Sequence, residues 1–163
     1  MADLLTHVLV AYAIGVLLSI RYDWISSEYV TIAMIGSLVP DLSRIELVIS
    51  SGMMESALGL SFSWGAFHTL GGSLIAIALG TLLVPARIRR RVFALLLVGV
   101  LSHHALDIVL MTPSGFTYDV LWPLTEYRPK APDLYLSSDQ WPVLIAFVLA
   151  GGVRYVIGVK GSE

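Results

Sequence analysis

The sequence predicts an all-α integral membrane helical bundle, with about four spanning helices and one shorter helix. Of the 163 residues, 56 % are hydrophobic and only 13 % are charged. The mean hydropathy is +0.81, far from the balance of a soluble domain. Several apolar runs also approach the roughly 20 residues that a helix needs to cross a bilayer. With no internal repeat or low-complexity tract, we expect residues 1–163 to form a single membrane-embedded domain.

Five apolar runs mark the expected helices. All but the second approach spanning length, so the second is expected to be the shorter helix. The first run has no basic stretch before it and no small-residue cleavage signature after it, so we expect it to stay in place and not to act as a removable signal peptide. In chain order the runs are Leu4–Ile20, Val30–Pro40, Ala66–Val84, Val92–Met111 and Pro142–Val159.

The basic residues predict which connections face the cytoplasm. Alternating spans place the short connections, residues 21–29 and 85–91, on one side with the C-terminus. The long connections, residues 41–65 and 112–141, then lie on the other side with the N-terminus. Seven of the ten Lys and Arg residues fall on the short-connection side, four of them between residues 87 and 91. Because positive charge is retained in the cytoplasm, we expect a multi-pass cell-membrane protein whose long connections are external.

The stretch "LSHHALDIVL", residues 101–110, sets ionisable side chains in an otherwise apolar run. His103 and Asp107 are four residues apart, so on a helix they share one face. A carboxylate within an apolar span needs a partner. His104 points away from that face. The pair therefore predicts a site and not a plain stretch of membrane helix.

The predicted threading brings further polar residues to the same external side. His7 lies at the start of the first helix, Asp41 at the end of the second and His68 at the start of the third. Together with the pair on the fourth run, five candidate ligands converge from four helices. The chain has no cysteine, so any metal must be held by His, Asp or Glu.

Each of these residues also has a simpler interpretation. A lone histidine near a helix end, such as His7, is more often hydrogen-bonded or interfacial than a ligand. Pro-Asp at residues 40–41 is also typical of a helix stop followed by an N-cap. Asp3 either orients the His7 imidazole or favours the positive end of the first helix. A hydrogen-bonded His103 and Asp107 pair would explain those two residues but not the others.

The converging ligands predict a metal site that opens at the external membrane interface, and metal-dependent hydrolysis is one function that such a site serves. The nitrogen and oxygen donors favour zinc among divalent metals, and zinc lowers the pKa of a water to roughly 7 and polarises phosphoryl or acyl oxygens. A site at headgroup depth suggests a phospholipid or another lipid-linked phosphate ester as substrate. His104, Asp119 and Glu126 are candidates for the general acid or base.

Two other classes stay open. Histidines on neighbouring membrane helices also suit a haem-binding protein, and the polar cluster also suits a cation-binding protein without catalysis. The expected partners are the bilayer and a lipid substrate. The formal net charge of −2 gives no general attraction to nucleic acid.

Five segments together resemble a known family. The segments "THVLVAYAIG", "VPDLSR", "FHTLGGSL", "LSHHALDIVLMTPSGF" and "VLWPL" are similar in order and spacing to membrane-bound metal-dependent hydrolases, an inner-membrane-associated family distantly similar to zinc-dependent phospholipases C. The resemblance covers most of the chain and implies a metal-dependent hydrolase, which we therefore expect, with its metal site at the external membrane interface. The matching positions are His7, Asp41, His68, Ser102 to Asp107 and Leu121 to Pro123.

The chain departs from that family pattern at two places. Many members carry a second acidic residue shortly after the Pro-Asp, where this chain has Ser43 and Arg44, and another histidine where this chain has Ser63. If the family site holds more than one metal, this chain is expected to hold fewer, or to recruit acidic residues from its connections. The acidic residues available are Glu46, Asp119 and Glu126.

Overall fold

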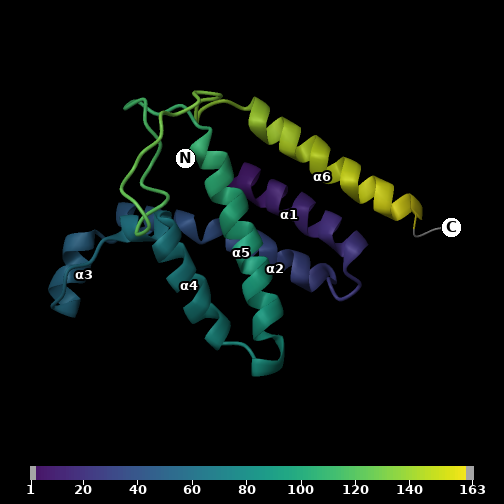
Figure 1. Ribbon diagram of the computed structural model, residues 1–163, viewed down its shortest axis with the longest axis horizontal. Coiled ribbons are helices and arrows are strands. Elements are labelled where there is room, and N and C mark those ends of the chain that lie inside the picture. Colours follow the sequence, from purple (N-terminus) through teal and green to yellow (C-terminus); the bar gives the residue numbers. More distant parts are fainter. Residues whose placement is uncertain (1–2, 161–163) are drawn as a thin grey trace.

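A computed structural model describes residues 3–160 of the chain (Figure 1). Over this range the protein is all-helical, as predicted, with six α-helices, two 3-10 helices and no β-strand. The elements are α1 (Leu4–Arg21), α2 (Ser27–Leu38), η1 (Pro40–Leu47), α3 (Ser51–Leu58), η2 (Trp64–His68), α4 (Leu70–Leu82), α5 (Ala86–Ile108) and α6 (Trp141–Lys160).

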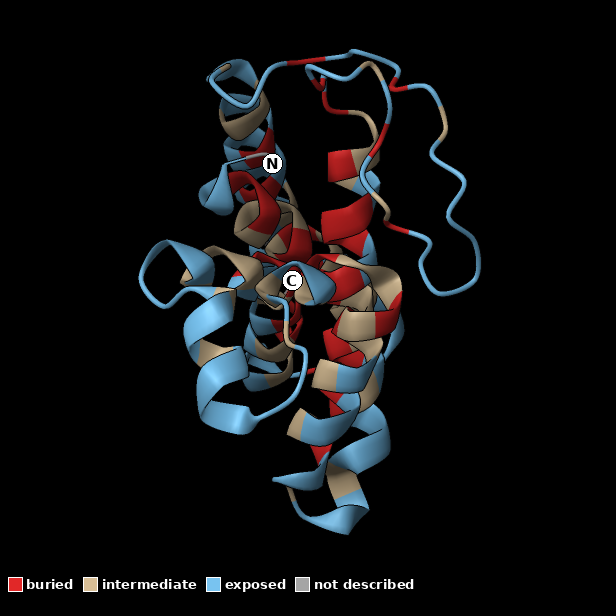
Figure 2. Ribbon diagram, turned by 90° about the vertical axis from the view of Figure 1, so that its left-hand side faces the viewer, coloured by how far each residue is buried: buried red, intermediate tan, exposed pale blue. Residues whose placement is uncertain are grey.

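Helix α5 is the centre of the bundle, and α2 crosses it in very close contact. A Cβ atom added to Gly36 of α2 would lie 2.3 Å from the Leu96 carbonyl oxygen. One added to Gly99 of α5 would lie 2.1 Å from the Ala33 carbonyl oxygen. Only glycine allows this approach of two helix backbones. Figure 2 shows the buried residues gathered where the helices cross, with the outer helix faces exposed.

Two helices among the described residues are long and apolar enough to cross a membrane, α1 and α5. Residues Leu70–Leu82 and Trp141–Val156 form shorter apolar helices. Helix α2, with 12 residues, is short as predicted. Two of the four predicted spans therefore have the length and hydropathy of a membrane helix in the structure. The span over the last apolar run stays a prediction, and the third run is not one continuous helix.

The prediction of one long helix over the third apolar run, residues 66–84, is wrong. The run is divided into η2 and α4 at Thr69, whose backbone is extended and whose Oγ1 accepts a hydrogen bond from the Gly72 amide at 3.1 Å. A threonine N-cap of this kind starts a new helix. Helix α4 is consequently only 13 residues long, and His68 lies in η2, before the helix that it was expected to open.

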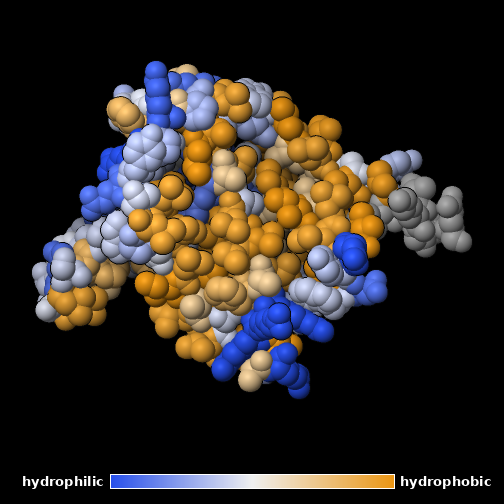
Figure 3. Space-filling view, in the orientation of Figure 1, coloured by the Kyte–Doolittle hydropathy of each residue, from blue (hydrophilic) through white to orange (hydrophobic). Residues whose placement is uncertain are grey.

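The two short connections lie together, as the alternating threading predicts. The guanidinium of Arg91, near the start of α5, lies 5.1 Å from the ring centre of Trp24 in the α1–α2 connection. In Figure 1 both connections lie toward the right and lower edge, whereas the long loop after α5 lies at the upper left. Figure 3 shows a broad hydrophobic surface between the hydrophilic groups at these two ends.

The loop between α5 and α6 folds back on itself and reaches the start of α4. The Met111 amide donates to the Tyr135 carbonyl at 2.8 Å, which pairs the two arms of the loop. At its far end the carbonyls of Val120 and Trp122 accept hydrogen bonds from the Leu70 and Gly71 amides, at 2.7 and 2.8 Å. The first amides of a helix have no partner within the helix, so the loop supplies partners that α4 lacks.

Candidate metal centre

The structure brings the five predicted ligand residues into two overlapping groups. The ligand atoms of His7, His103 and Asp107 lie within 4.8 Å of one another. Those of Asp41, His68 and His103 do so as well, which makes His103 common to both groups. The residues come from α1, η1, η2 and α5, and all five are buried. Convergence from four parts of the chain is therefore confirmed.

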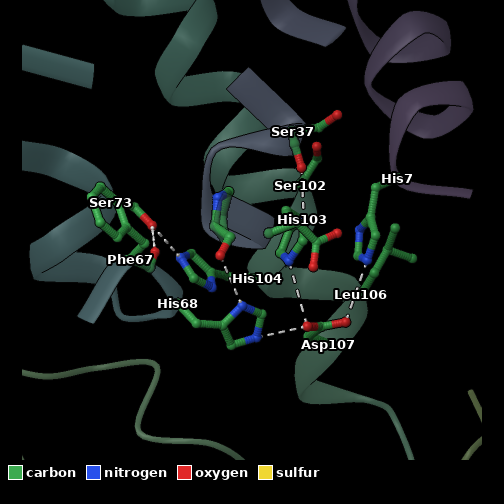
Figure 4. Close-up of polar contacts among 12 residues, drawn as sticks. His7, Ser37, Phe67, His68, Ser73, Ser102, His103, His104, Leu106 and Asp107 are labelled. Atoms are coloured by element: carbon green, nitrogen blue, oxygen red, sulfur yellow. Dashed lines mark hydrogen bonds and ion pairs between the residues drawn. The ribbon is translucent and has the colours of Figure 1, made fainter. Parts of the chain in front are cut away.

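The Asp107 carboxylate is the centre of the cluster, surrounded by three imidazole rings (Figure 4). Its oxygens lie 3.4 Å from Nε2 of His7, 2.9 Å from Nε2 of His68 and 3.5 Å from Nε2 of His103. Ligand atoms of a tetrahedral zinc, at about 2.0–2.1 Å from the ion, lie about 3.3–3.4 Å from one another. Two of the three spacings thus match the edge of a zinc tetrahedron closely, and the third is somewhat shorter.

Two of the rings have their outer nitrogens turned toward backbone carbonyls. Nδ1 of His103 lies 2.7 Å from the Ser37 carbonyl oxygen, and Nδ1 of His68 lies 3.4 Å from the Pro40 carbonyl oxygen. A carbonyl only accepts, so each Nδ1 carries the proton. In the neutral imidazole Nε2 then presents a lone pair, and both lone pairs are directed at an acceptor, the Asp107 carboxylate. A cation between them resolves this arrangement, and a backbone carbonyl on the other ring nitrogen is the usual partner of a metal-binding histidine.

His7 completes the cluster from the N-terminal part of α1. Its ring stacks on that of His103, with centroids 3.7 Å apart and planes 14° apart. Neither nitrogen of the buried His7 ring has a hydrogen-bond partner in the described structure. Asp3 does not orient this ring, because its carboxylate caps α1 by accepting from the Leu5 amide at 3.2 Å. Of the two roles considered for Asp3, the structure supports the helix cap.

The two carboxylate oxygens of Asp41 have different surroundings. Arg44 Nε donates to Asp41 Oδ1 at 2.8 Å, whereas the buried Oδ2 has no hydrogen-bond partner in the described structure. The Arg44 side chain is 37 % exposed, so the guanidinium lies between the buried carboxylate and the surface. The N-cap of η1 is Val39 and not Asp41, so the N-cap role considered for Asp41 is not observed and Oδ2 is available as a ligand.

His104 lies beside the cluster but faces another helix. Ser73 Oγ of α4 donates to the Phe67 carbonyl at 2.7 Å, so its lone pairs accept from Nε2 of His104, which lies 3.2 Å away. The second ring nitrogen, Nδ1, is buried without a hydrogen-bond partner in the described structure. His104 is therefore held in place by Ser73 and is not one of the rings around Asp107.

The other two predicted acid or base residues are on the surface of the long loop. Asp119 forms an ion pair with Arg128 in which both side chains are substantially exposed. Glu126 is also exposed. The structure thus places both on the loop that covers the site, but not among the buried groups of the cluster.

One aromatic residue of the site was not predicted from the sequence. Tyr118, on the long loop, meets the His68 ring edge to face, with centroids 5.4 Å apart. Burial, and secondarily the negative charge of Asp107, raises the pKa of its phenol, so the hydroxyl stays a hydrogen-bond donor at neutral pH. The "SGFTYD" segment in which Tyr118 lies carries no pattern that would have distinguished this tyrosine from the others in the loop.

Comparison with known proteins agrees with the membrane composition. Residues 1–161 match the family model described as YdjM inner membrane protein. The chain belongs to the YdjM inner membrane protein family. It is therefore a membrane protein, as its composition predicts. No curated protein and no solved structure matches the chain significantly.

In this member of the YdjM family, the site combines three features that a metal requires. It has three Nε2 atoms around a carboxylate, buried donor atoms without hydrogen-bond partners, and second ring nitrogens on carbonyl oxygens. The residues present therefore fit a divalent cation, and the nitrogen-rich donor set fits zinc better than calcium or magnesium, which prefer all-oxygen sites.

Proposed function

We propose that the protein is a multi-pass membrane hydrolase that uses zinc to cleave a phospholipid or another lipid-linked phosphate ester. The observation that supports this most strongly is the pair of Nε2 lone pairs, on His68 and His103, directed at the Asp107 carboxylate. These three residues would hold the ion together with His7 or Asp41. The ion would compensate the buried carboxylates, and neutral imidazoles would donate their lone pairs to it.

The chemistry follows from the donor set and its surroundings. Bound zinc supplies a nucleophile at neutral pH, because it lowers the pKa of water to about 7. The Ser37 and Pro40 carbonyls hold the His103 and His68 rings in one tautomer and orientation. Burial of the cluster keeps bulk water away from it, which strengthens electrostatic interactions inside. The Tyr118 hydroxyl offers a donor from the loop side.

The arrangement of the ends supports a site on the non-cytoplasmic side. The cluster lies beside the long loop, because the Tyr118 ring of that loop meets the His68 ring, and the loop lies away from the α4–α5 connection (Figure 1). The cluster Arg87 to Arg91 lies at the start of α5, about five helical turns from Asp107. Because arginines of short connections stay in the cytoplasm, the site faces outward, at the depth of lipid headgroups.

A haem-binding function is less compatible with the geometry. The His7 and His103 rings stack at a centroid distance of 3.7 Å, so there is no gap for a porphyrin between them. Haem iron also has no need of a carboxylate among its histidines. A cation-binding protein without catalysis has the same ligands as the proposed hydrolase, and turnover decides between those two.

Zinc content and hydrolysis test the proposal. The protein purified in detergent without added metal should contain one zinc per chain by elemental analysis, and should release phosphate-containing products from phospholipid vesicles. Loss of a residue that only hydrogen-bonds to a metal ligand lowers metal affinity roughly 10–100-fold. Asp107→Asn and His103→Gln remove a ligand itself, so each should lower zinc affinity by more than that. Both substitutions preserve side-chain size, so folding is expected to survive.

His104→Gln is the matched control, because His104 neighbours His103 on the same helix but is held by Ser73. It should keep the zinc. Full zinc content in folded Asp107→Asn and His103→Gln proteins would contradict the ligand assignment. Zinc binding without hydrolysis of any phospholipid would favour the cation-binding alternative.

A further inference from the structure

A cavity of about 420 Å³ lies beside the proposed metal centre and has a charged lining. Ser43, Arg44, Glu46, Leu47 and Tyr118 form its walls. The first four come from η1, and Tyr118 comes from the long loop. The cavity therefore lies between the helix that carries Asp41 and the loop that covers the cluster.

Two of these residues contact the cluster itself. Arg44 donates to Asp41 at 2.8 Å, and the Tyr118 ring lies against the His68 ring. A molecule in the cavity would thus meet a guanidinium and a phenol, each of which directly contacts a proposed metal ligand. These are the donor types that proteins use for phosphate oxygens, arginine above all.

The charges around the cavity include one guanidinium and one carboxylate, which together disfavour an anion of two charges. The Asp41 and Asp107 carboxylates together balance the two positive charges of a zinc ion, and the Arg44 guanidinium, which pairs with Asp41, adds one positive charge. Glu46 adds a negative charge to the cavity wall. Its carboxylate accepts hydrogen bonds from the amide and hydroxyl of Ser51, and these lower its pKa, so it stays ionised at neutral pH.

We propose that this cavity binds the phosphate of a phosphodiester, with Arg44 and Tyr118 donating to the non-bridging oxygens and Glu46 disfavouring a phosphomonoester. A phosphodiester carries only one negative charge, so it can accept from Arg44 with less repulsion from Glu46 than a dianion meets. A phosphomonoester carries nearly two above its second pKa of about 6, and like-charge juxtaposition with Glu46 opposes it. The assignment rests on the proposed function and narrows its substrate class to diesters.

Binding of two small probes tests the assignment without turnover. Dimethyl phosphate, a monoanion, and methyl phosphate, a dianion at pH 8, are titrated into the zinc-loaded protein in detergent, with phosphorus NMR as the readout. We expect dimethyl phosphate to bind about tenfold more tightly or better. Arg44→Gln should weaken its binding about 10–100-fold, the range for a hydrogen bond to a charged group. Arg44→Lys should restore part of it.

Glu46→Gln tests the selectivity separately and should reduce the preference for the diester by tightening methyl phosphate binding. Arg128→Gln is the matched control, because Arg128 also pairs with an aspartate on this side of the molecule but does not line the cavity. It should change neither affinity. Arg44 and Glu46 lie near the surface in η1, so these variants are expected to fold, and each is checked for unchanged zinc content.

The outcomes separate this assignment from the proposed function. A wild-type protein without zinc overturns the hydrolase proposal and the assignment with it. A protein with zinc and phospholipid hydrolysis, but with equal affinity for the two probes, overturns the assignment alone. So does a diester preference that persists in Glu46→Gln, or diester binding that Arg44→Gln leaves unchanged.

Discussion

At the scale of single residues, the site depends on where α2 ends. The last carbonyls of a helix have no partner within it, and Pro40, which has no amide hydrogen, prevents α2 from continuing. The Ser37 and Pro40 carbonyls are consequently available to the His103 and His68 rings. A proline at the end of a short helix thereby sets the tautomers of two histidines that lie far away in the sequence.

The glycine contact between α2 and α5 sets the distance from these carbonyls to α5. Gly36→Ala would place a Cβ atom 2.3 Å from the Leu96 carbonyl oxygen, so the helices must separate. We expect a loss of about 1–3 kcal/mol in the free energy of unfolding, the usual cost of overpacking. Thermal unfolding in detergent measures it. Weakened zinc binding should accompany it, because the Ser37 carbonyl moves with α2.

Gly80→Ala is the control for this prediction. Nothing lies within 4 Å of a Cβ atom added at Gly80 in α4, and alanine is the better helix former by about 1 kcal/mol. This variant should unfold at the same or a higher temperature than the wild type. An unfolding temperature for Gly36→Ala at or above the wild-type value would contradict the close crossing.

The candidate ligands could be recognised from the sequence because ionisable side chains are costly in an apolar run. His103 and Asp107 also share a helix face by spacing alone. The partners of those ligands could not be recognised, since two of them are backbone carbonyls, which every residue possesses. The role of Tyr118 was equally hidden, because it depends on how an irregular loop folds over η2.

At the scale of elements, the helices that follow a continuous apolar pattern were predicted well. Helix α1 begins at Leu4, where its run was expected to begin, whereas α5 begins at Ala86, six residues before the expected run and within the residues assigned to a connection. The third run misled because its apolar composition continues through Thr69, where a side-chain cap divides it. Hydropathy measures transfer from water and carries no information about such a cap. Helix α3 was likewise not distinguished within the long connection that contains it.

The long loop is fastened to α5 by a buried tyrosine. The Tyr135 hydroxyl donates to the Leu106 carbonyl at 3.0 Å. Burial, with the charge of Asp107 as a second cause, raises the pKa of Tyr135 to about 12. Because the pKa is raised in the folded state, the protonated Tyr135 phenol contributes its full stabilisation of the fold below about pH 10, the pKa of tyrosine in an unfolded chain. This stabilisation is lost as the pH rises through about 12.

We therefore expect the loop to stay docked through neutral and mildly alkaline pH. The ultraviolet absorbance of tyrosinate should show a component that titrates near pH 12 in the wild type and is absent from Tyr135→Phe. Tyr127→Phe is the control, since Tyr127 is exposed on the same loop, and this variant should keep the late component. If the absorbance component that titrates near pH 12 persisted in Tyr135→Phe, the raised pKa would belong to another tyrosine.

At the scale of the whole molecule, the hydrophobic and hydrophilic parts of the surface are separated in the way that a membrane protein requires. The hydrophobic surface in Figure 3 lies between two hydrophilic ends, and the polar cluster lies beside the long loop, whose Tyr118 ring meets the His68 ring. A bundle in a bilayer can keep ionisable groups only where they are paired, hold a cation or face water. The ionisable groups of the cluster are paired with one another, which meets the first condition, and the proposed cation would meet the second.

The orientation of the bundle leads to a prediction about both ends. Glu126→Cys, on the long loop, should react with a membrane-impermeant maleimide in intact cells. Arg87→Cys, at the α4–α5 connection, should react only after the membrane is opened. Both native residues are exposed, and the protein has no cysteine of its own, so each signal reports a single position. Because arginines near the ends of membrane helices are retained in the cytoplasm, the reverse pattern would place the metal centre on the cytoplasmic side, and reaction of both positions in intact cells would contradict a membrane between them.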